Sequence, residues 1–246
     1  MVININSKDN KVIKYVNSLR NNNTMYEKRQ FITEGEHLFL MALESKSIAF
    51  VVTLSKKDLP DSITQYIVTE DIMKKISINK SIPNVITICN FINSKTNDDR
   101  ILFYLDNVQD PGNFGTIIRS AIAFNFKNIL VSENTVNKYN EKCIQASQGG
   151  IFSINIERID CKILKKYKDD GYKIVVSLLD KTALKLTDFI DNKKEKYIFV
   201  FGNEGQGVSK EVISLADFKL YIPISNIDSL NVGIATSIVM YELSQK

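Results

Sequence analysis

The chain has 246 residues, of which 44% are hydrophobic and 24% charged, with a formal net charge of +4. This composition is that of a globular protein with one large or two modest domains. No uninterrupted apolar run reaches the about 18 residues of a membrane span, and the first residues lack the regions of a secretory signal. We therefore expect a cytoplasmic protein that makes no use of a membrane.

The cysteines and the single histidine exclude several kinds of site. Cys89, Cys143 and Cys161 are odd in number and far apart, so they predict neither a disulfide framework nor a metal site. His37 lies in an expected helix, far from the glycine-rich segments described below, which argues against Ser-His-Asp or Cys-His catalysis.

The first half of the sequence has the pattern of a small α/β domain. Helices are expected at 8–20, 34–44 and 69–77, strands at 48–54 and 85–91, and an exposed turn at 21–23. The stretch 92–100 is polar and aperiodic, and we take it as the linker between a domain at 1–95 and a domain at 100–246.

The second half alternates apolar strands with helical patterns. Strands are expected at 101–105, 128–131, 173–178, 197–201 and 218–222, and helices at 115–126, 140–148, 159–168, 209–215 and 232–243. Continuously apolar strands separated by helices predict a parallel sheet that is covered on both faces.

Glycine is concentrated in three short segments of this second half. Six of the ten glycines fall in the segments 107–120 (NVQDPGNFGTIIRS), 201–208 (FGNEGQGV) and 222–235 (IPISNIDSLNVGIA). Each segment follows an expected strand, and the carboxyl ends of parallel strands share one edge, where ligands bind. Ordinary strand-to-helix turns also use Gly and Asn, but three such loops together favour one binding site built largely of backbone.

The absence of other motifs narrows the ligand. No G-x-G-x-x-G follows the first strand of this half, and the segment 201–208 lacks the G-K-[ST] ending of a phosphate loop. Glu204 would also repel a triphosphate. The site is therefore expected to bind a ligand that is not dominated by phosphate or metal.

The three segments resemble, in order, the three motifs of the SpoU/TrmH family of RNA ribose 2′-O-methyltransferases, in the SPOUT superfamily. Asn113 and Arg119 match the first motif, Glu204 matches the second, and Ser229 and Asn231 match the third. The resemblance implies that these five residues belong to the catalytic site.

The same resemblance implies a cofactor, a fold and a partner. S-adenosylmethionine would be held by backbone groups of Gly202, Ile222 and Leu230, in an α/β domain with a deep trefoil knot that also forms a homodimer. Two departures from the family stand out: Gly233 replaces a small hydroxyl residue or alanine, and the loop at 223–229 is one residue short.

The first half resembles, more loosely and mainly over 28–40, the L30e-like RNA-binding domain of the family. Residues 1–33 hold six basic and two acidic residues. Their net charge of +4 equals that of the whole chain. Solvated surface charge is the plain explanation, and a face that contacts RNA phosphates is the alternative. The candidates for RNA contact are the basic residues Lys11, Lys14, Arg20, Lys28 and Arg29.

Each predicted catalytic residue also has a structural alternative. A guanidinium stays protonated to about pH 12, so we expect Arg119 to stabilise an alkoxide or a phosphate rather than to act as a base. The structural alternative is that Arg119 only forms a surface ion pair. Glu204 would orient Arg119, from the same or the partner subunit, or fix the glycine loop. Asn113, Ser229 and Asn231 could instead cap helices.

The leading hypothesis is an S-adenosylmethionine-dependent enzyme that methylates a ribose 2′-hydroxyl in RNA, with ribosomal RNA favoured over transfer RNA because of the L30e-like domain. The alternatives are a tRNA ribose methyltransferase and a non-catalytic RNA-binding or ribosome-assembly factor that kept the fold. A small-molecule nucleotide-binding enzyme is disfavoured by the missing phosphate motifs.

Overall fold

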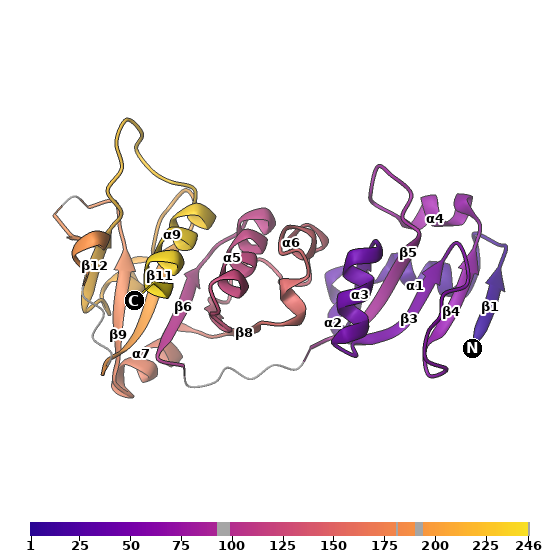
Figure 1. Cartoon of the computed structure of the whole chain (residues 1–246). Helices are drawn as coiled ribbons and strands as arrows, with labels where there is room; N and C mark the ends of the chain where they lie inside the picture. The colour runs from indigo at the N-terminus through magenta and orange to yellow at the C-terminus, as the bar shows by residue number, and fades with distance from the viewer. Residues whose placement is uncertain (93–98, 181, 190–193, 246) are drawn as a thin grey trace. The chain divides into compact units, whose positions relative to one another are not determined.

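The computed structural model describes residues 1–92, 99–180, 182–189 and 194–245. The chain divides into two compact units, Met1–Asn93 and Ser94–Lys246, and each is described by itself (Figure 1). The expected linker at 92–100 lies mostly outside the described residues. Within the described residues, no helix is long and apolar enough to cross a membrane.

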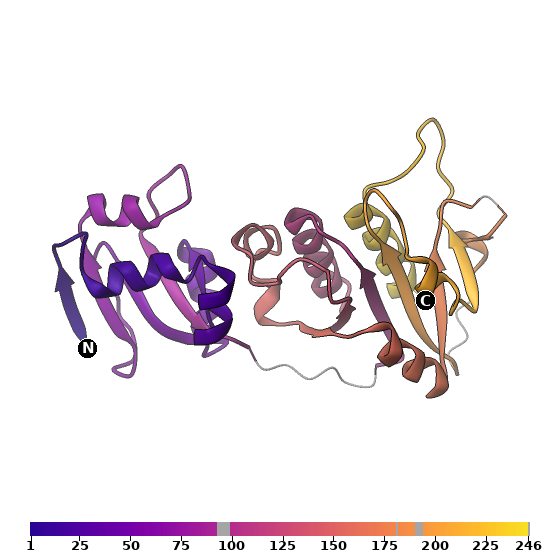
Figure 2. The same cartoon turned by 180° about the vertical axis from the view of Figure 1, so that it is seen from behind.

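The first unit is a five-stranded mixed sheet in the order β1-β4-β3-β5-β2, with helices on both faces (Figure 2). β1, β4 and β3 run parallel, whereas β3, β5 and β2 pair antiparallel. Its elements are β1 (Val2–Ile5), α1 (Lys11–Ser18), α2 (Asn22–Lys28), β2 (Gln30–Glu34), α3 (Glu36–Glu44), β3 (Ile48–Thr53), β4 (Thr64–Val68), α4 (Glu70–Ile76) and β5 (Val85–Asn90).

Alternating residues of this sheet pack against different helices. Ile32, Val52 and Ile88 join a core with α1 and α4, whereas Val51 and Val85 pack with Phe39 of α3. The α/β character expected for this half is observed, and burial on both faces explains why β3 and β5 are almost wholly apolar.

The expected turn at 21–23 is wrong, because these residues begin α2. The side chain of Asn21 accepts hydrogen bonds from the backbone N–H groups of Asn23 and Thr24. A run of asparagines has low helix propensity, but an Asn at the N-cap stabilises the first turn. The helix expected from residue 34 begins instead at Glu36, because Gly35 adopts a φ of +98° and ends β2.

The second unit contains a seven-stranded sheet in the order β10-β12-β9-β11-β6-β7-β8, in which every strand pair is parallel. The predicted parallel sheet is therefore confirmed for the described residues. Its elements are β6 (Ile101–Asp106), α5 (Pro111–Ala123), β7 (Asn128–Val131), α6 (Glu141–Ala146), β8 (Asn155–Arg158), α7 (Cys161–Asp169), β9 (Tyr172–Ser177), β10 (Leu184–Lys185), β11 (Lys196–Gly202), α8 (Lys210–Ile213), β12 (Phe218–Tyr221) and α9 (Val232–Ser244), with 3-10 turns at Gly150–Phe152 and Leu186–Asp188.

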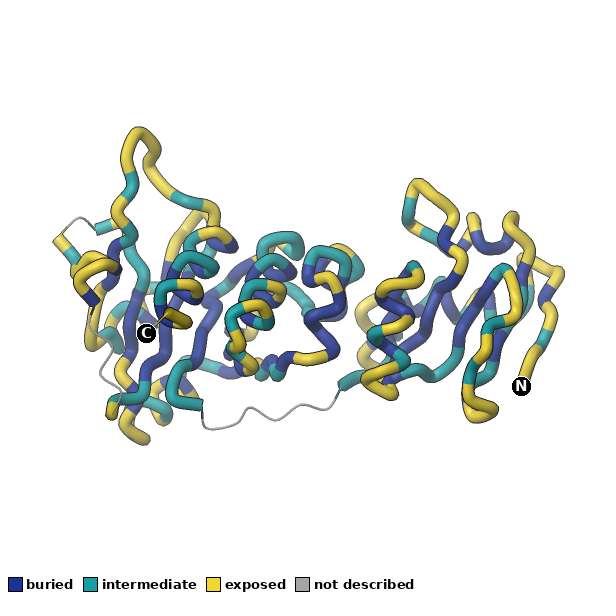
Figure 3. The backbone as a smooth tube through the Cα atoms, in the orientation of Figure 1, coloured by how far each residue is buried: buried dark blue, intermediate teal, exposed yellow. Residues whose placement is uncertain are grey.

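Two hydrophobic cores cover the faces of this sheet, and its central strands are buried throughout (Figure 3). Phe103, Phe199 and Phe201 pack with α5 and α9 on one face. Tyr104 and Val200, from the same two strands, pack with α7 and α8 on the other. The alternation of β6 and β11 between two cores accounts for their uninterrupted apolar sequences.

Close helix packing supports the first of these cores. A Cβ atom added to Gly115 of α5 would lie 2.5 Å from the Cβ of Ala146 and 2.6 Å from the carbonyl oxygen of Cys143. On the other side of α5, the hydroxyls of Ser120 and Ser237 share a hydrogen bond of 2.7 Å and join α5 to α9. α5 therefore packs tightly between α6 and α9, and its amino terminus is fixed in place.

We expect Gly115→Ala to lower the free energy of unfolding by about 1–3 kcal/mol, because the new methyl group meets backbone that cannot move cheaply. Gly233→Ala in α9 is the matched control. Its nearest neighbour would be the side-chain oxygen of Asn231 at 3.1 Å, so we expect a change below about 1 kcal/mol. Urea unfolding of both variants measures the difference, and equal stabilities would contradict the packing argument.

Candidate active site

The three glycine-rich loops meet at the carboxyl edge of the parallel sheet. β6 and β11 are neighbours, and Asp106 at the end of one strand lies opposite Gly202 at the end of the other. The loop after β12 leads back to α9, which packs against α5 and β11. The predicted convergence of segments 107–120, 201–208 and 222–235 is thus confirmed.

A relay of side-chain hydrogen bonds joins the three loops directly. The amide of Asn113 donates from Nδ2 to Oε1 of Glu204 at 2.9 Å. Its Oδ1 accepts a hydrogen bond of 2.8 Å from Nδ2 of Asn231. Asn113 therefore contacts both other loops at once, through its amide nitrogen to Glu204 and through its amide oxygen to Asn231.

Helix caps fix the ends of this relay. Asn231 is the N-cap of α9 and accepts from the N–H groups of Gly233 and Ile234, so its predicted capping role is confirmed. The capping alternatives for Asn113 and Ser229 are wrong. Asp110 caps α5 and accepts from the N–H of Asn113 at 2.7 Å, because Pro111 is the first helical residue and the cap therefore lies three residues before Asn113.

The loop after β11 is a closed turn with a fixed shape. Asn203 and Gly207 exchange two backbone hydrogen bonds of 2.9 Å. The side chain of Asn203 accepts from the N–H groups of Gly205 and Gln206, and donates to the carbonyl of Asn107 at 2.8 Å. A Cβ atom on Gly202 would overlap the backbone of Gly207, so only glycine permits this turn to close.

Asp106 stabilises the same turn through hydrogen bonds to neighbouring residues. This carboxylate is 3% exposed, accepts the N–H of Ser209 at 2.7 Å, and accepts from the side chain of Asn107 at 3.1 Å. Burial raises the pKa of the nearby Tyr104 hydroxyl, and the Asp106 charge raises it further. The hydrogen bond from the Ser209 N–H to Asp106 also holds Ser209, which is the N-cap of α8.

Four residues that organise the site were missed in the sequence. They are Asp106, Asn107, Asp110 and Asn203. The available signal was the presence of small polar residues at the end of β6 and in the loops that follow β6 and β11, where strand ends expose backbone donors.

A cavity of about 580 Å³ lies between the loops at 201–208 and 222–235, and residues 177–179 at the end of β9 also line it. Its wall contains the three residues predicted to hold the cofactor, Gly202, Ile222 and Leu230, and also Ser229 and the relay residues Glu204 and Asn231. The volume is in the range of small-molecule sites. Among the described residues that form the wall, Glu204 is the one charged side chain, which favours a cationic ligand over a polyphosphate.

Arg119 lies outside this cavity. It is exposed on α5, and no hydrogen bond or ion pair to it is found among the described residues. The predicted contact of Glu204 with Arg119 does not form within one chain, because Glu204 accepts from Asn113 instead. Arg119 is therefore available to a molecule outside the chain.

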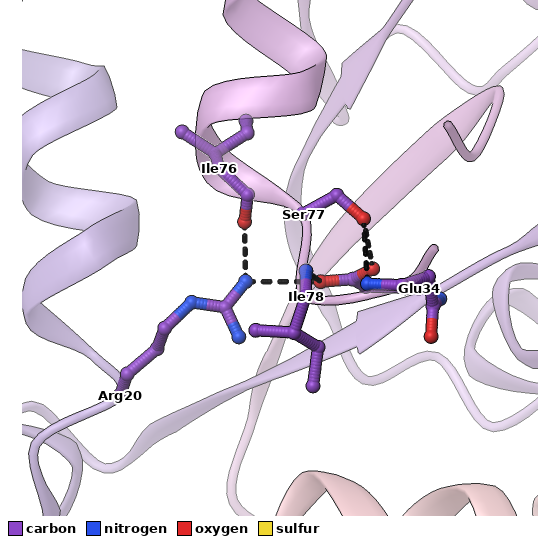
Figure 4. Close-up of polar contacts among 6 residues, drawn as sticks. Arg20, Glu34, Ile76, Ser77 and Ile78 are labelled. Carbon is purple, nitrogen blue, oxygen red and sulfur yellow. Dashed lines mark hydrogen bonds and ion pairs between the residues drawn. The ribbon is translucent and has the colours of Figure 1, made fainter. Parts of the chain in front are cut away.

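One of the predicted RNA-contacting residues, Arg20, is built into the first unit (Figure 4). Its guanidinium donates to Oε1 of Glu34 at 2.9 Å and to the carbonyl of Ile76 at the end of α4. The Glu34 side chain is 1% exposed and also accepts from Ser77 and Ile78. Arg20 compensates a buried carboxylate, so we withdraw it from the RNA-contacting set.

The other four candidates, Lys11, Lys14, Lys28 and Arg29, are exposed.

No group of three or more His, Cys, Asp or Glu side chains that could hold a metal ion occurs within the described residues.

Comparison with known proteins places these loops in a family. The model of the SpoU rRNA Methylase family matches residues 100–241, which span all three loops and the relay. The chain belongs to the SpoU rRNA methylase family. The resemblance seen in the three sequence segments is thereby confirmed.

Two of the relatives of this SpoU methylase extend over both units, and a third matches a shorter part of the chain. It is 28% identical to the 23S rRNA (guanosine(2553)-2′-O)-methyltransferase RlmP of Bacillus subtilis, over 97% of this chain and 98% of the relative. The AdoMet-bound rRNA methyltransferase of Sinorhizobium meliloti has a TM-score of 0.88 and 26% identity, covering 99% of this chain and 98% of that one. The tRNA (guanosine(18)-2′-O)-methyltransferase of Aquifex aeolicus is 33% identical over 59% of this chain and 69% of its own length.

We expect Arg20→Ala to lower the free energy of unfolding of the SpoU methylase by about 2–4 kcal/mol, because it leaves the Glu34 carboxylate buried without its cation. Lys14→Ala, which removes an exposed cation 3.8 Å from Asp9, should change stability by less than about 0.5 kcal/mol. Urea unfolding measures both. An Arg20→Ala variant as stable as the wild type would return Arg20 to the set of RNA-contact candidates.

Proposed function

We propose that this SpoU methylase transfers a methyl group from S-adenosylmethionine to the 2′-hydroxyl of a ribose in ribosomal RNA. The observation that carries the proposal is the cavity at the carboxyl edge of the sheet, whose wall holds Gly202, Ile222 and Leu230 beside the Glu204–Asn113–Asn231 relay. A binding cavity and a polar constellation from three separate loops are what a group transfer between two bound molecules requires.

The residues of the cavity suit this cofactor. Backbone of the turn at 202–207 offers fixed donors and acceptors to a nucleoside, and Ile222 and Leu230 provide apolar surface for its base. Glu204 contributes the negative charge that a sulfonium and an ammonium group favour. The cofactor, when bound, supplies an electrophilic methyl group on a positively charged sulfur.

Arg119 is proposed to stabilise the ribose oxygen as it becomes nucleophilic. Its guanidinium is always protonated, so it acts through charge on the developing alkoxide or on the adjacent phosphate. A water molecule or a phosphate oxygen of the RNA would take the proton. Asn113, Glu204 and Asn231 join the three loops, and Ser229 lies in the cavity wall.

A deep trefoil knot and a homodimer formed through it are part of the proposal. The return of the chain from β12 across the sheet to α5, where α9 packs, supports the knot. Ile234 and Tyr241 of α9 are 48% and 50% exposed, which supports a second copy on this helix. The dimer would bring a partner residue towards Arg119, for which the described part of the chain offers no hydrogen bond or ion pair.

The first unit is proposed to be an L30e-like domain at 1–95 that binds the RNA, with the methyltransferase domain at 100–246. Ribosomal RNA is favoured because the RlmP and Sinorhizobium relatives extend over both units, whereas the Aquifex tRNA enzyme matches 59% of this chain. A cytoplasmic location follows from such a substrate. A tRNA substrate is the second candidate.

Mapping of 2′-O-methyl nucleotides in ribosomal and transfer RNA, from cells with and without the gene, tests the proposal. We expect one ribosomal nucleotide to lose its methyl group when the gene is deleted. A loss confined to transfer RNA would favour the second candidate. No loss in either RNA, together with no methyl transfer by the purified protein, would favour a non-catalytic RNA-binding factor.

Arg119→Ala should lower kcat by about 10²–10³-fold, the usual cost of removing a donor that stabilises a developing oxyanion. The Kd for S-adenosylmethionine should stay within twofold, since Arg119 lies outside the cavity wall. Lys127→Ala removes another exposed cation from the same unit and should leave both constants unchanged. Turnover by Arg119→Ala at the wild-type rate would remove Arg119 from the mechanism.

Gly202→Ala should weaken S-adenosylmethionine binding at least 100-fold, because the added Cβ overlaps the backbone of Gly207 and opens the turn that forms the cavity wall. Gly205→Ala is the control from the same loop. Its new Cβ would have its nearest neighbour at 3.6 Å, so we expect binding within about threefold of the wild type. Isothermal titration calorimetry with the cofactor separates the two variants, and equal affinities would count against the proposed cofactor site.

A further inference from the structure

Two aromatic rings and an arginine form an exposed cluster at one edge of the first unit. Tyr26 of α2 meets Phe91 edge-on, with ring centroids 5.5 Å apart and an interplanar angle of 88°. The guanidinium carbon of Arg29 lies 5.5 Å from the centroid of the Phe91 ring. Tyr26 is 50% exposed, and among the described residues of this unit it is the one exposed aromatic side chain.

The cluster is held by backbone as well as by ring contacts. The N–H of Phe91 donates to the carbonyl of Arg29 at 2.8 Å, next to a 2.9 Å bond between the Gln30 and Asn90 side chains. Phe91 also packs against the buried ring of Phe31, with centroids 6.4 Å apart. The Phe31 ring and the backbone hydrogen bond to Arg29 hold Phe91 in place, and Phe91 in turn contacts Tyr26 and Arg29.

Arg29 occupies a backbone position that ordinarily favours glycine. It ends α2 in the left-handed conformation, with φ +51°, and its N–H bonds to the last carbonyls of the helix. Glycine is the common residue there because any side chain adds strain. Here the position holds a planar cation over the Phe91 ring instead. Strained backbone at a residue with an exposed charged side chain is typical of a functional position.

We infer that Tyr26 and Arg29, supported by Phe91, form the surface on which an unpaired base of the RNA substrate stacks. This inference rests on the proposed function. Proteins that bind single-stranded RNA stack bases on aromatic rings and on guanidinium planes. Adjacent Lys28 adds positive charge, and its 2.8 Å ion pair with Glu27 is fully exposed, so a phosphate can replace the carboxylate at low cost.

The charge of the cluster favours RNA over a protein partner. A single half-exposed tyrosine is a small apolar area, far below the contiguous patch that marks a protein interface. The two neighbouring cations match a polyanion, and a base supplies a flat π-face of the size of one ring. The occupant is therefore an unpaired nucleotide rather than an apolar peptide.

The matched pair Arg29→Gly and Lys46→Gly tests this inference in the full chain. Lys46 is also exposed, follows a helix in this unit and has a positive φ, +56°. Both variants relieve the same strain and remove one charge, so both should unfold at or above the wild-type temperature. Only Arg29→Gly removes the stacked guanidinium.

Two measurements are made on each variant. The first is the KM for ribosomal RNA purified from cells that lack the gene. The second is the Kd for fluorescent single-stranded oligoadenylate, which presents bases without a defined fold. We expect Arg29→Gly to raise both about tenfold or more with kcat within twofold, and Lys46→Gly to leave both within twofold. Tyr26→Leu should behave like Arg29→Gly, and Tyr26→Phe like the wild type, because phenylalanine keeps the ring.

The possible failures are distinguishable. Equal effects of Arg29→Gly and Lys46→Gly, or wild-type behaviour of Tyr26→Leu, would overturn the stacking surface while methylation of ribosomal RNA continued. Absence of methylation by the wild-type protein would overturn the proposed function. In that case, an oligoadenylate affinity that falls in Tyr26→Leu but not in Tyr26→Phe would still support the stacking surface.

Discussion

The amide of Asn113 is the group on which the site of this SpoU methylase depends. Its Nδ2 donates to Glu204 and its Oδ1 accepts from Asn231, on two other loops. The register that sets Asp106 opposite Gly202 brings the first two loops within reach. The third reaches them because α9 returns to pack on α5. An amide that makes both bonds fixes the relative positions of three segments that lie far apart in the sequence.

The rigidity of these loops comes from backbone that is satisfied locally. Asn203 closes the turn at 203–207 and ties it to Asn107, while Asp106 anchors its far end at Ser209. Few charged side chains are then needed in the cavity wall, and Glu204 is the one present among its described residues. Binding by fixed backbone costs little reorganisation, whereas the proposed electrostatic contribution of Arg119 comes from outside the cavity. The proposed function therefore assigns cofactor binding and activation of the hydroxyl to separate groups of this chain.

Much of this arrangement could be predicted from the sequence, since buried parallel strands are continuously apolar and the loops after them carry the glycines. In the second unit the prediction missed two strands, β8 and β10, because it relied on continuous apolar runs. In the first unit it also missed β1, β2 and β4. β8 (N-I-E-R) has one apolar residue, and β10 has two residues, because both lie at sheet edges. Which polar side chains pair could not be predicted. Asn113 was placed in the site through a family resemblance, but its partners depend on distances that no periodicity contains.

The basic segment 1–33 of the first unit, the basic arm, shows the same limit in its charges. Arg20 and Arg29 are indistinguishable by residue type, and both were expected to contact RNA. Burial separates them: Arg20 lies beside a carboxylate that is 1% exposed and would be costly to leave without a cation. Arg29 is exposed and lies over the half-buried ring of Phe91, at a backbone position where glycine would be less strained. Arg20 is engaged with a buried carboxylate, whereas Arg29 lies at the surface in contact with an aromatic ring, which is the arrangement that the proposed base stacking requires. On this argument Arg29, and not Arg20, is the arginine of the arm to test for RNA recognition.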